Sequence, residues 1–274
     1  MLTSDVENYP GFAEPVLGPE LMQRMRMQAE KFGPDILFDD VTHVDFKKRP
    51  FTVTVGGETR KGRTVIIATG AFAKWLGLPS EERFRGRGVS TCATCDGYFF
   101  KGKNVIVVGG GDTAMEEASF LANITNHVTV VHRRDTLKAS RIMQEKTLKN
   151  PKIDFLWNSV VTDILGDQHV VGVKTANLKT GSIASLKTDG LFVAIGYQPN
   201  TDVFKGEVQL DEKGYVVTRD ETRTNVPGVF AAGDVRDHRY RQAVTAAADG
   251  CKAAIDADRY LLEYGEQQLG LPQQ

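Results

Sequence analysis

The sequence predicts an α/β protein built from two Rossmann-like nucleotide-binding folds, one inserted in the other. Residues 104–108 are apolar on both faces, as in a strand of a parallel sheet, and lead directly into a glycine-rich turn and a helical pattern. Residues 64–70 and 191–196 repeat one theme, an apolar strand that closes on a glycine. This weak internal repeat predicts two similar folds within one chain.

Length and composition fit two domains of ordinary size. The chain has 274 residues, of which 41% are hydrophobic, and this is enough for two cores. Its 34 basic and 35 acidic side chains give a formal net charge of -1, so no overall field draws it to nucleic acid or to an anionic membrane. No apolar run has the length of a transmembrane helix and the first residues are polar, so we expect a soluble, cytoplasmic protein.

The first third of the chain predicts a helix and a small meander. Apolar residues recur at helical spacing over 19–32, and Gly33 follows as a C-cap. A short strand is expected at 36–38, then alternating strands at 41–46 and 51–55 before Gly56 and Gly57. The apolar run at 64–70 closes this part as a buried strand.

The remaining elements follow the strand-helix alternation of a parallel sheet. We expect strands at 104–108, 128–131 and 153–157, with helices after the first and at 140–148. A hairpin joins strands at 160–165 and 170–176 around Gly166 and Asp167. After the strand at 191–196 and the apolar run that ends at 233, a long helix opens at Arg241.

A Cys-x-x-Cys stands at Cys92 and Cys95 and is followed at once by Asp96. Such a pair can be a redox pair, half of a zinc site or two unrelated buried thiols. Zinc would usually need a second Cys-x-x-Cys or a His-x-x-x-His pair. Neither occurs, because the only other cysteine is Cys251 and the five histidines form no such pair. We predict no metal site, which leaves dithiol chemistry or coincidence. Cys251, on the final helix, is expected to be a packed small residue rather than a third redox thiol.

The turn after residues 104–108 matches Gly-x-Gly-x-x-Ala in strand, turn, helix order. Glycine first makes the tight turn, the second glycine lets the backbone approach a pyrophosphate, and the final alanine allows close packing of helix on strand. The helix N-terminus then faces the phosphates. Alone the match is weak, because glycine-rich strand exits are common. The motif residues are Gly109, Gly110, Gly111, Asp112, Thr113 and Ala114.

A basic cluster follows the next strand and supports the prediction of a dinucleotide site. Where an NAD-binding fold ends that strand on an acid, this chain has His132, Arg133 and Arg134, with Lys138 and Arg141 a little further on. A phosphate is the matching counter-charge. A solvated basic helix start explains Arg141 but not a cluster beside the second ribose, so we predict NADPH rather than NADH.

Asp234 ends the last apolar strand as part of a Gly-Asp pair and precedes a helix rich in small residues. Such a carboxylate suits a hydrogen bond to a cofactor hydroxyl, with the helix start facing an electron-rich group. An ordinary capping aspartate explains the same spacing equally well.

Taken together, these residues resemble the low-molecular-weight NADPH-dependent thioredoxin reductases, and the resemblance covers about residues 5–262. The matching segments occur in family order, and a Cys-x-x-Cys just ahead of an NADP-binding motif is highly specific. Lys138 replaces the arginine of many members, which keeps the charge but loses bidentate contact. The segments are Glu7-Asn8-Tyr9-Pro10-Gly11, Ala68-Thr69-Gly70, Cys92-Ala93-Thr94-Cys95-Asp96, the glycine motif, His132-Arg133-Arg134, Gly233-Asp234 and Arg241-Gln242-Ala243.

The resemblance implies a homodimeric flavoprotein that moves electrons from NADPH through FAD to the Cys92–Cys95 disulfide and on to thioredoxin or a similar dithiol protein. It implies an FAD domain in two pieces, 1–72 and 199–274, around an NADPH domain at 73–198 that carries the dithiol. Cys92 would attack thioredoxin, Cys95 would lie against the flavin, and Asp96 would move a proton, with a helix N-cap as its alternative role. Implied FAD contacts are Asn8, Val41, Cys95, Asp234, Arg241, Gln242 and Ala243, and implied NADPH contacts are the glycine motif, Arg133, Arg134 and Lys138.

One departure from the family pattern is large. Members begin with a strand, Gly-x-Gly-x-x-Gly turn and helix for the FAD pyrophosphate, and this sequence opens after that unit. We expect either a start at an internal methionine or a fragment. The alternative function is a flavin-free NADP(H)-binding remnant that keeps a redox-active cysteine pair without reductase turnover.

Overall fold

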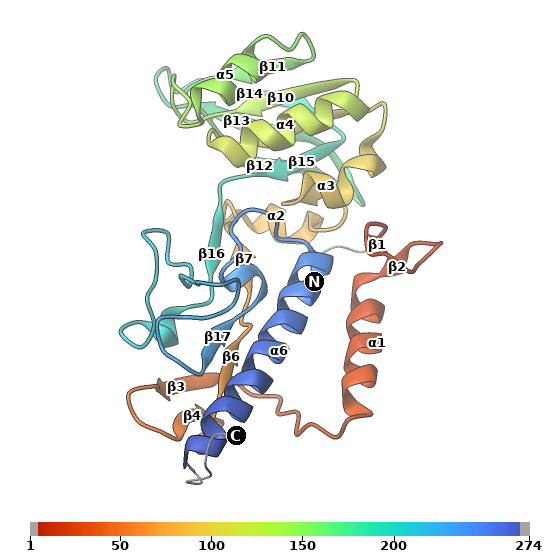
Figure 1. Cartoon of the computed structure of the whole chain (residues 1–274). Coiled ribbons are helices and arrows are strands. Elements are labelled where there is room, and N and C mark those ends of the chain that lie inside the picture. The colour runs from red at the N-terminus through yellow and green to blue at the C-terminus, as the bar shows by residue number, and fades with distance from the viewer. Residues whose placement is uncertain (1–4, 269–274) are drawn as a thin grey trace. The chain divides into compact units, whose positions relative to one another are not determined.

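The computed structural model describes residues 5–268, and the chain divides into two compact units (Figure 1). Unit 1 combines residues 1–33 with 73–196, and unit 2 combines residues 34–72 with 197–274. The sequence assigns the first 33 residues to the flavin domain instead, and the predicted domain boundaries stay a prediction. The chain passes between the units at β7 (Ala71–Ala73) and β16 (Tyr197–Pro199), which pair with each other. Within the described range, no helix has the length and apolar character needed to cross a bilayer.

Unit 1 is built on a five-stranded parallel sheet with the strand order β11-β10-β9-β15-β8. The strand that carries the glycine motif, β9, lies at its centre, where Val107 pairs with Val130 on one side and Phe192 on the other. The predicted strands at 104–108, 128–131, 153–157 and 191–196 are therefore confirmed. The five strands are β8 (Val89–Ser90), β9 (Asn104–Val108), β10 (His127–Val131), β11 (Ile153–Leu156) and β15 (Gly190–Val193).

Alternate residues of this sheet feed two different cores, so unit 1 has three layers (Figure 1). On β9, Val105 and Val107 pack with α4 (Asp112–Ile124), and Ile106 and Val108 pack with the antiparallel meander. The meander consists of β12 (Ser159–Gly166), β13 (Val170–Asn177) and β14 (Ile183–Lys187). The sequence predicted the first two of these strands and missed β14, because β14 is mostly exposed and has no apolar alternation. The predicted helix at 140–148 is α5 (Arg141–Leu148).

The first residues of unit 1 form a small separate cluster. The hairpin of β1 (Asp5–Val6) and β2 (Val16–Leu17) leads into α1 (Gly18–Glu30), and Leu21 packs with Val6 and Val16. The helix predicted at 19–32 is confirmed. The strand predicted at 36–38 is wrong, since these residues have no strand neighbour and Phe38 is 76% exposed.

Unit 2 repeats the layered plan with fewer strands. Its parallel pair, β6 (Val65–Ile67) and β17 (Val229–Ala231), is covered on one face by the long helix α6 (Ala243–Gln268). The other face packs on an antiparallel meander of β3 (Val41–Asp45), β4 (Phe51–Val55) and β5 (Glu58–Gly62). The sequence predicted β3 and β4 and missed β5, which is mostly exposed and has no apolar alternation. The expected α/β fold with two Rossmann-like, three-layer domains is confirmed.

Short elements complete the two units. Unit 1 also holds α2 (Pro79–Phe84), α3 (Ala93–Asp96) and the 3-10 helix η1 (Gly97–Phe100), and unit 2 holds η2 (Asp202–Phe204) and η3 (Gly233–Val235). Two of them, α3 and η3, carry the candidate chemistry.

Candidate functional site

The two cysteines of the Cys-x-x-Cys form a disulfide in the structure. Cys92 immediately precedes α3 and Cys95 lies within it, and both side chains are half-buried. The helix packs closely on the core of unit 1. Ala93 is buried in that core, and a Cβ at Gly97 would lie 3.1 Å from the Leu121 side chain of α4. Packing on α4 therefore holds the disulfide near the surface of a rigid domain, as a thiol that must meet a protein partner requires.

Asp96 occupies the N-cap position of η1. It is the last residue of α3 and immediately precedes η1, and its side chain makes no capping hydrogen bond there. Its Oδ2 accepts a hydrogen bond of 2.6 Å from the Ser90 hydroxyl at the end of β8. The Ser90 Oγ also accepts the Cys92 backbone N–H at 3.1 Å. The Ser90 hydroxyl therefore connects the Asp96 carboxylate with the Cys92 backbone, and the role of Asp96 in proton transfer stays a prediction.

The glycine motif has the local geometry that a phosphate loop needs. A Cβ at Gly109 would lie 2.4 Å from the Ala194 carbonyl oxygen and 2.7 Å from the Ala114 Cβ, so this close approach of strand and helix requires both small residues. A Cβ at Gly110 would overlap the His132 ring. Gly111, the N-cap residue of α4, has open space on its outer side. The backbone amides at the start of α4 are therefore accessible to an anion.

The basic segment that follows β10 folds back over this loop. The Lys138 and Ala139 amides donate to the Gly110 carbonyl at 2.7 and 3.1 Å, and the Ser140 amide donates to the Asp112 carboxylate at 2.8 Å. Asp112 therefore orders the protein loop itself. Buried His132 lies beneath the loop, and its desolvation lowers the pKa of its ring.

The guanidinium and ammonium groups of the basic cluster are available to a ligand. Arg133, Arg134 and Lys138 are exposed, and no carboxylate among the described side chains, residues 6–264, lies within ion-pair distance of them. Arg141, by contrast, forms an ion pair with Glu145 on an exposed face of α5, as expected for a basic residue at a solvated helix start. The structure thus brings the glycine loop and the basic cluster together in one place in unit 1.

Asp234 lies in η3, directly after β17 in unit 2. Its Oδ1 is buried and accepts no hydrogen bond from the described residues. Its pKa is raised from 3.8 to about 6, mainly by burial and also by the negative charges of Asp237 and Asp249, while the positive charge of Arg241 opposes the rise. A buried carboxylate oxygen without a donor fits a ligand hydroxyl, because native proteins leave few such atoms unsatisfied.

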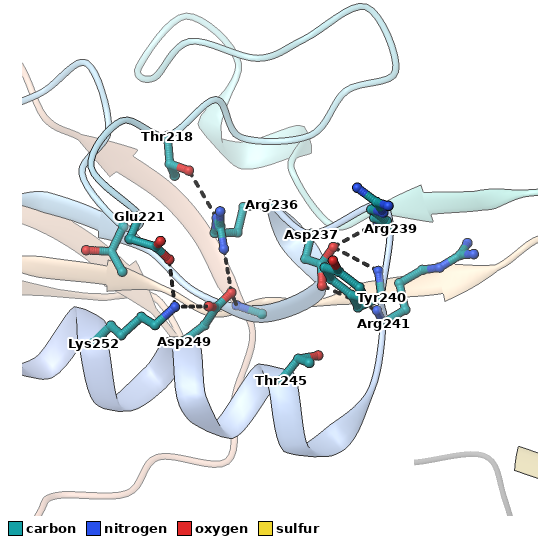
Figure 2. A network of polar contacts seen from close by, with 12 residues as sticks. Thr218, Glu221, Arg236, Asp237, Arg239, Tyr240, Arg241, Thr245, Asp249 and Lys252 are labelled. Carbon is teal, nitrogen blue, oxygen red and sulfur yellow. Dashed lines mark hydrogen bonds and ion pairs between the residues drawn. The ribbon is translucent and has the colours of Figure 1, made fainter. Parts of the chain in front are cut away.

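A network of polar contacts holds the turn that follows η3 and joins it to α6 (Figure 2). Asp237 is the residue that caps the following turn, since its carboxylate accepts the Arg239 and Tyr240 amides at 2.8 and 3.0 Å. Asp249 of α6 accepts Arg236 Nη1 at 2.7 Å and the Gly233 amide at 3.3 Å. These hydrogen bonds are made by Asp237 and Asp249, and the role of Asp234 as a cofactor ligand stays a prediction.

Arg241 has an unusual backbone beside this turn. Its φ is +51°, in the left-handed region that side chains rarely adopt, and its guanidinium lies 3.9 Å from the centre of the Tyr197 ring. The long helix starts two residues later than the sequence predicts, at Ala243. Gln242 precedes it, and its backbone carbonyl accepts the Ala246 amide.

The other predicted flavin contacts are spread over the chain. Val41 begins β3 in unit 2, together with Asp234 and Arg241, whereas Asn8 and Cys95 belong to unit 1. The sequence reasoning did not single out Ser90 or Asp249. Ser90 stands two residues before Cys92, and this spacing was the only signal that could have identified it.

Cys251 corrects one expectation. It was expected to be a packed small residue, but its side chain is exposed on α6. The helix buries Ala253 and Ala257 against β17 instead, so Cys251 faces away from that core.

Comparison with known proteins agrees over nearly the whole chain. The family described as pyridine nucleotide-disulphide oxidoreductase matches residues 1–250. A thioredoxin reductase of Streptomyces coelicolor is 51% identical over 275 residues, covering 100% of this chain and 85% of that protein. A thioredoxin reductase of Rickettsia conorii is 52% identical over 265 residues, covering 95% and 86%. The solved thioredoxin reductase of Giardia duodenalis is similar with a TM-score of 0.91 and 43% identity, covering 95% and 86%.

Proposed function

Because this chain belongs to the pyridine nucleotide-disulphide oxidoreductase family, we propose that it is an NADPH-dependent thioredoxin-disulfide reductase. The observation that carries the proposal is the Cys92–Cys95 disulfide at α3, which belongs to the same unit as the glycine loop and three exposed cations, Arg133, Arg134 and Lys138. The relatives named thioredoxin reductase, about half identical over nearly the full chain, support the same activity.

We propose NADPH as the electron donor. The open backbone at Gly111 and the start of α4 would hold the pyrophosphate, and Arg133, Arg134 and Lys138 would bind the 2′-phosphate. Thr113 and Ala114 complete the close packing that brings this backbone to the ligand.

We propose FAD as the second cofactor, because unit 2 has a group that fits it. The orphaned oxygen of Asp234 would accept a hydrogen bond from a cofactor hydroxyl, and Arg241, Gln242 and Ala243 would line the site where α6 begins. Asn8, Val41 and Cys95 are further proposed contacts. A bound flavin supplies two-electron transfer between a nicotinamide and a disulfide.

The dithiol would then pass two electrons to thioredoxin by thiol exchange. The Cys92 thiolate attacks the thioredoxin disulfide, which forms a mixed disulfide and releases one thioredoxin thiolate. The Cys95 thiolate attacks the Cys92 sulfur, which restores the Cys92–Cys95 disulfide and releases the second thioredoxin thiol. Asp96 supplies or removes the proton that each sulfur needs. Exposed Tyr98 and Phe99, directly after α3, offer apolar contact to such a partner.

The proposal is tested by thioredoxin-dependent NADPH oxidation with purified protein. We expect a flavin absorption band, turnover with thioredoxin, and loss of turnover in Cys92→Ser and Cys95→Ser. Colourless protein that binds NADPH, takes up no FAD and gives no turnover would establish the flavin-free remnant instead. A homodimer stays a prediction, and light scattering after size exclusion gives its mass.

A further inference from the structure

We propose that Ser90 is a positioning residue for the dithiol, whose hydroxyl joins the Asp96 carboxylate and the Cys92 backbone in one hydrogen-bonded group. The proposal rests on the proposed function for its biological role. Ser90 Oγ lies 2.6 Å from Asp96 Oδ2, 3.1 Å from the Cys92 nitrogen and 3.4 Å from the Cys92 carbonyl oxygen. These contacts reach both the acid and the first cysteine from one side chain.

Ser90 is held by the sheet rather than by a loop. It is the last residue of β8, pairs with Phe192 of β15, and is 7% exposed. Cys95 and Asp96 lie on a helix of only four residues, and Cys92 immediately precedes it. The sheet therefore holds Ser90 in place, and its hydroxyl orients Asp96 and Cys92 through hydrogen bonds.

The hydroxyl can satisfy its neighbours in both protonation states of Asp96. A serine hydroxyl has one hydrogen and two acceptor sites. When Asp96 is ionised, Ser90 donates its hydrogen to Oδ2 and accepts the Cys92 amide. When Asp96 carries a proton, the carboxyl donates to Ser90 Oγ, and the hydroxyl hydrogen turns to the Cys92 carbonyl oxygen. The group thus changes charge without leaving a buried donor unpaired, and unpaired donors are costly.

This arrangement suits the proton balance of disulfide reduction. Two electrons break the S–S bond and leave two thiolates, and Asp96 gives its proton to one sulfur. The resulting carboxylate keeps the Ser90 hydrogen bond. A cavity of about 230 Å³, lined by Ser90 and Asp96 and also by Arg87, Lys103 and His169, connects this pair with solvent, from which Asp96 regains its proton. The three basic residues are the other titratable groups that face the pair across this cavity.

The test measures reduction of the Cys92–Cys95 disulfide by dithiothreitol, which needs neither flavin nor NADPH. All variants carry Cys251→Ser so that maleimide labelling reports only the pair. We expect Ser90→Ala to slow reduction at pH 7 roughly tenfold, because a hydrogen bond to a charged group is lost. Ser90→Thr keeps the hydroxyl on a strand that tolerates branching and should stay close to the parent rate.

Two controls separate positioning from general damage to the fold. Ser119→Ala removes another buried hydroxyl of unit 1, one without a hydrogen-bond partner among the described residues, and should leave the rate unchanged. In an Asp96→Asn background, adding Ser90→Ala should lower the reduction rate by less than about twofold, because both changes act on the same hydrogen-bonded group. Equal rates for Ser90→Ala and Ser119→Ala, or a full tenfold loss in the Asp96→Asn background, would overturn the proposal.

The same variants distinguish this inference from the proposed function. If thioredoxin turnover is absent in the parent while dithiothreitol reduction still depends on Ser90, the proposed function fails and the positioning role stands. If turnover is present, Ser90→Ala should lower kcat and alter its pH profile while leaving the KM for NADPH unchanged. A change in that KM with no change in kcat would contradict the role.

Discussion

Replacing Asp234 by asparagine should stabilise unit 2 at neutral pH and weaken flavin binding. The carboxylate is buried beside two other carboxylates, and its pKa rises from 3.8 to about 6 in the folded chain. Between these pH values the folded state binds more protons than the unfolded state. The contribution of Asp234 to the free energy of unfolding therefore falls as the pH rises from about 4 to about 6 and stays constant at higher pH.

The magnitude follows from the size of the pKa change. At 1.36 kcal/mol per pH unit, the rise from 3.8 to about 6 corresponds to at most about 3 kcal/mol. Because Asp234 is only partly buried, we expect a gain of about 1–2 kcal/mol at pH 8 for Asp234→Asn, and no gain at pH 4. The new amide can donate to the neighbouring carboxylate of Asp237 or Asp249, so it need not remain unpaired.

Hydrogen exchange of the α6 and β17 amides at pH 5, 6, 7 and 8 reports on the unit that holds Asp234, whether or not the two units unfold together. Asp258→Asn, which changes an exposed carboxylate on the same helix, is the matched control and should be neutral. Titration with FAD should show at least tenfold weaker binding for Asp234→Asn. The reasoning is refuted if the variant is no more stable than the parent at pH 8, or keeps the parent's pH slope.

Three further changes test the rest of the assignment. Arg133→Gln with Arg134→Gln should raise the KM for NADPH roughly a hundredfold and the KM for NADH only slightly, because two charge-assisted contacts to one phosphate are lost. An equal rise in KM for both nucleotides would contradict the assignment of a 2′-phosphate site to these residues. Cys251→Ser should leave thioredoxin turnover within about twofold, because one exposed thiol outside the Cys-x-x-Cys has no role in the exchange, and a large loss in that assay would require a third redox thiol. Tyr98→Ala should raise the KM for thioredoxin roughly tenfold with kcat little changed, since an exposed aromatic beside the dithiol is a typical binding hot spot; an unchanged KM would place the partner elsewhere.

Periodicity predicted the elements that are buried and failed for those that are not. β9 and α4 have apolar patterns on the faces that meet the core; β9 has the predicted bounds, and α4 carries the apolar residues expected of the helix after the glycine motif. β14 is held by its backbone pairing with β13 and exposes most of its side chains, so it has no apolar signature. The apolar residues at 36–38 predicted a strand, but a strand needs a hydrogen-bonding neighbour, and sequence alone does not provide that information.

The two aspartates show what the sequence left undecided. The sequence allowed two interpretations of Asp96 and of Asp234, a functional role or a helix cap, because an aspartate beside a helical turn fits both. The difference lies in where other donors are. Asp96 receives the hydroxyl of a serine six residues earlier, whereas the donors near Asp234 are engaged by Asp237 and Asp249. Such contacts depend on the folded backbone, so the spacing could not separate the two interpretations.

This contrast also assigns different energetic roles to the two carboxylates. Asp96 has a hydrogen-bond donor within the protein, so its carboxylate does not depend on a cofactor for that hydrogen bond. Asp234 has an oxygen that the described protein does not satisfy, and ionisation of this group destabilises the free chain above pH 6. A ligand that donates to this oxygen removes the penalty, and the recovered free energy contributes to its binding. The unit that holds Asp234 should therefore gain more stability from its cofactor at pH 8 than at pH 5.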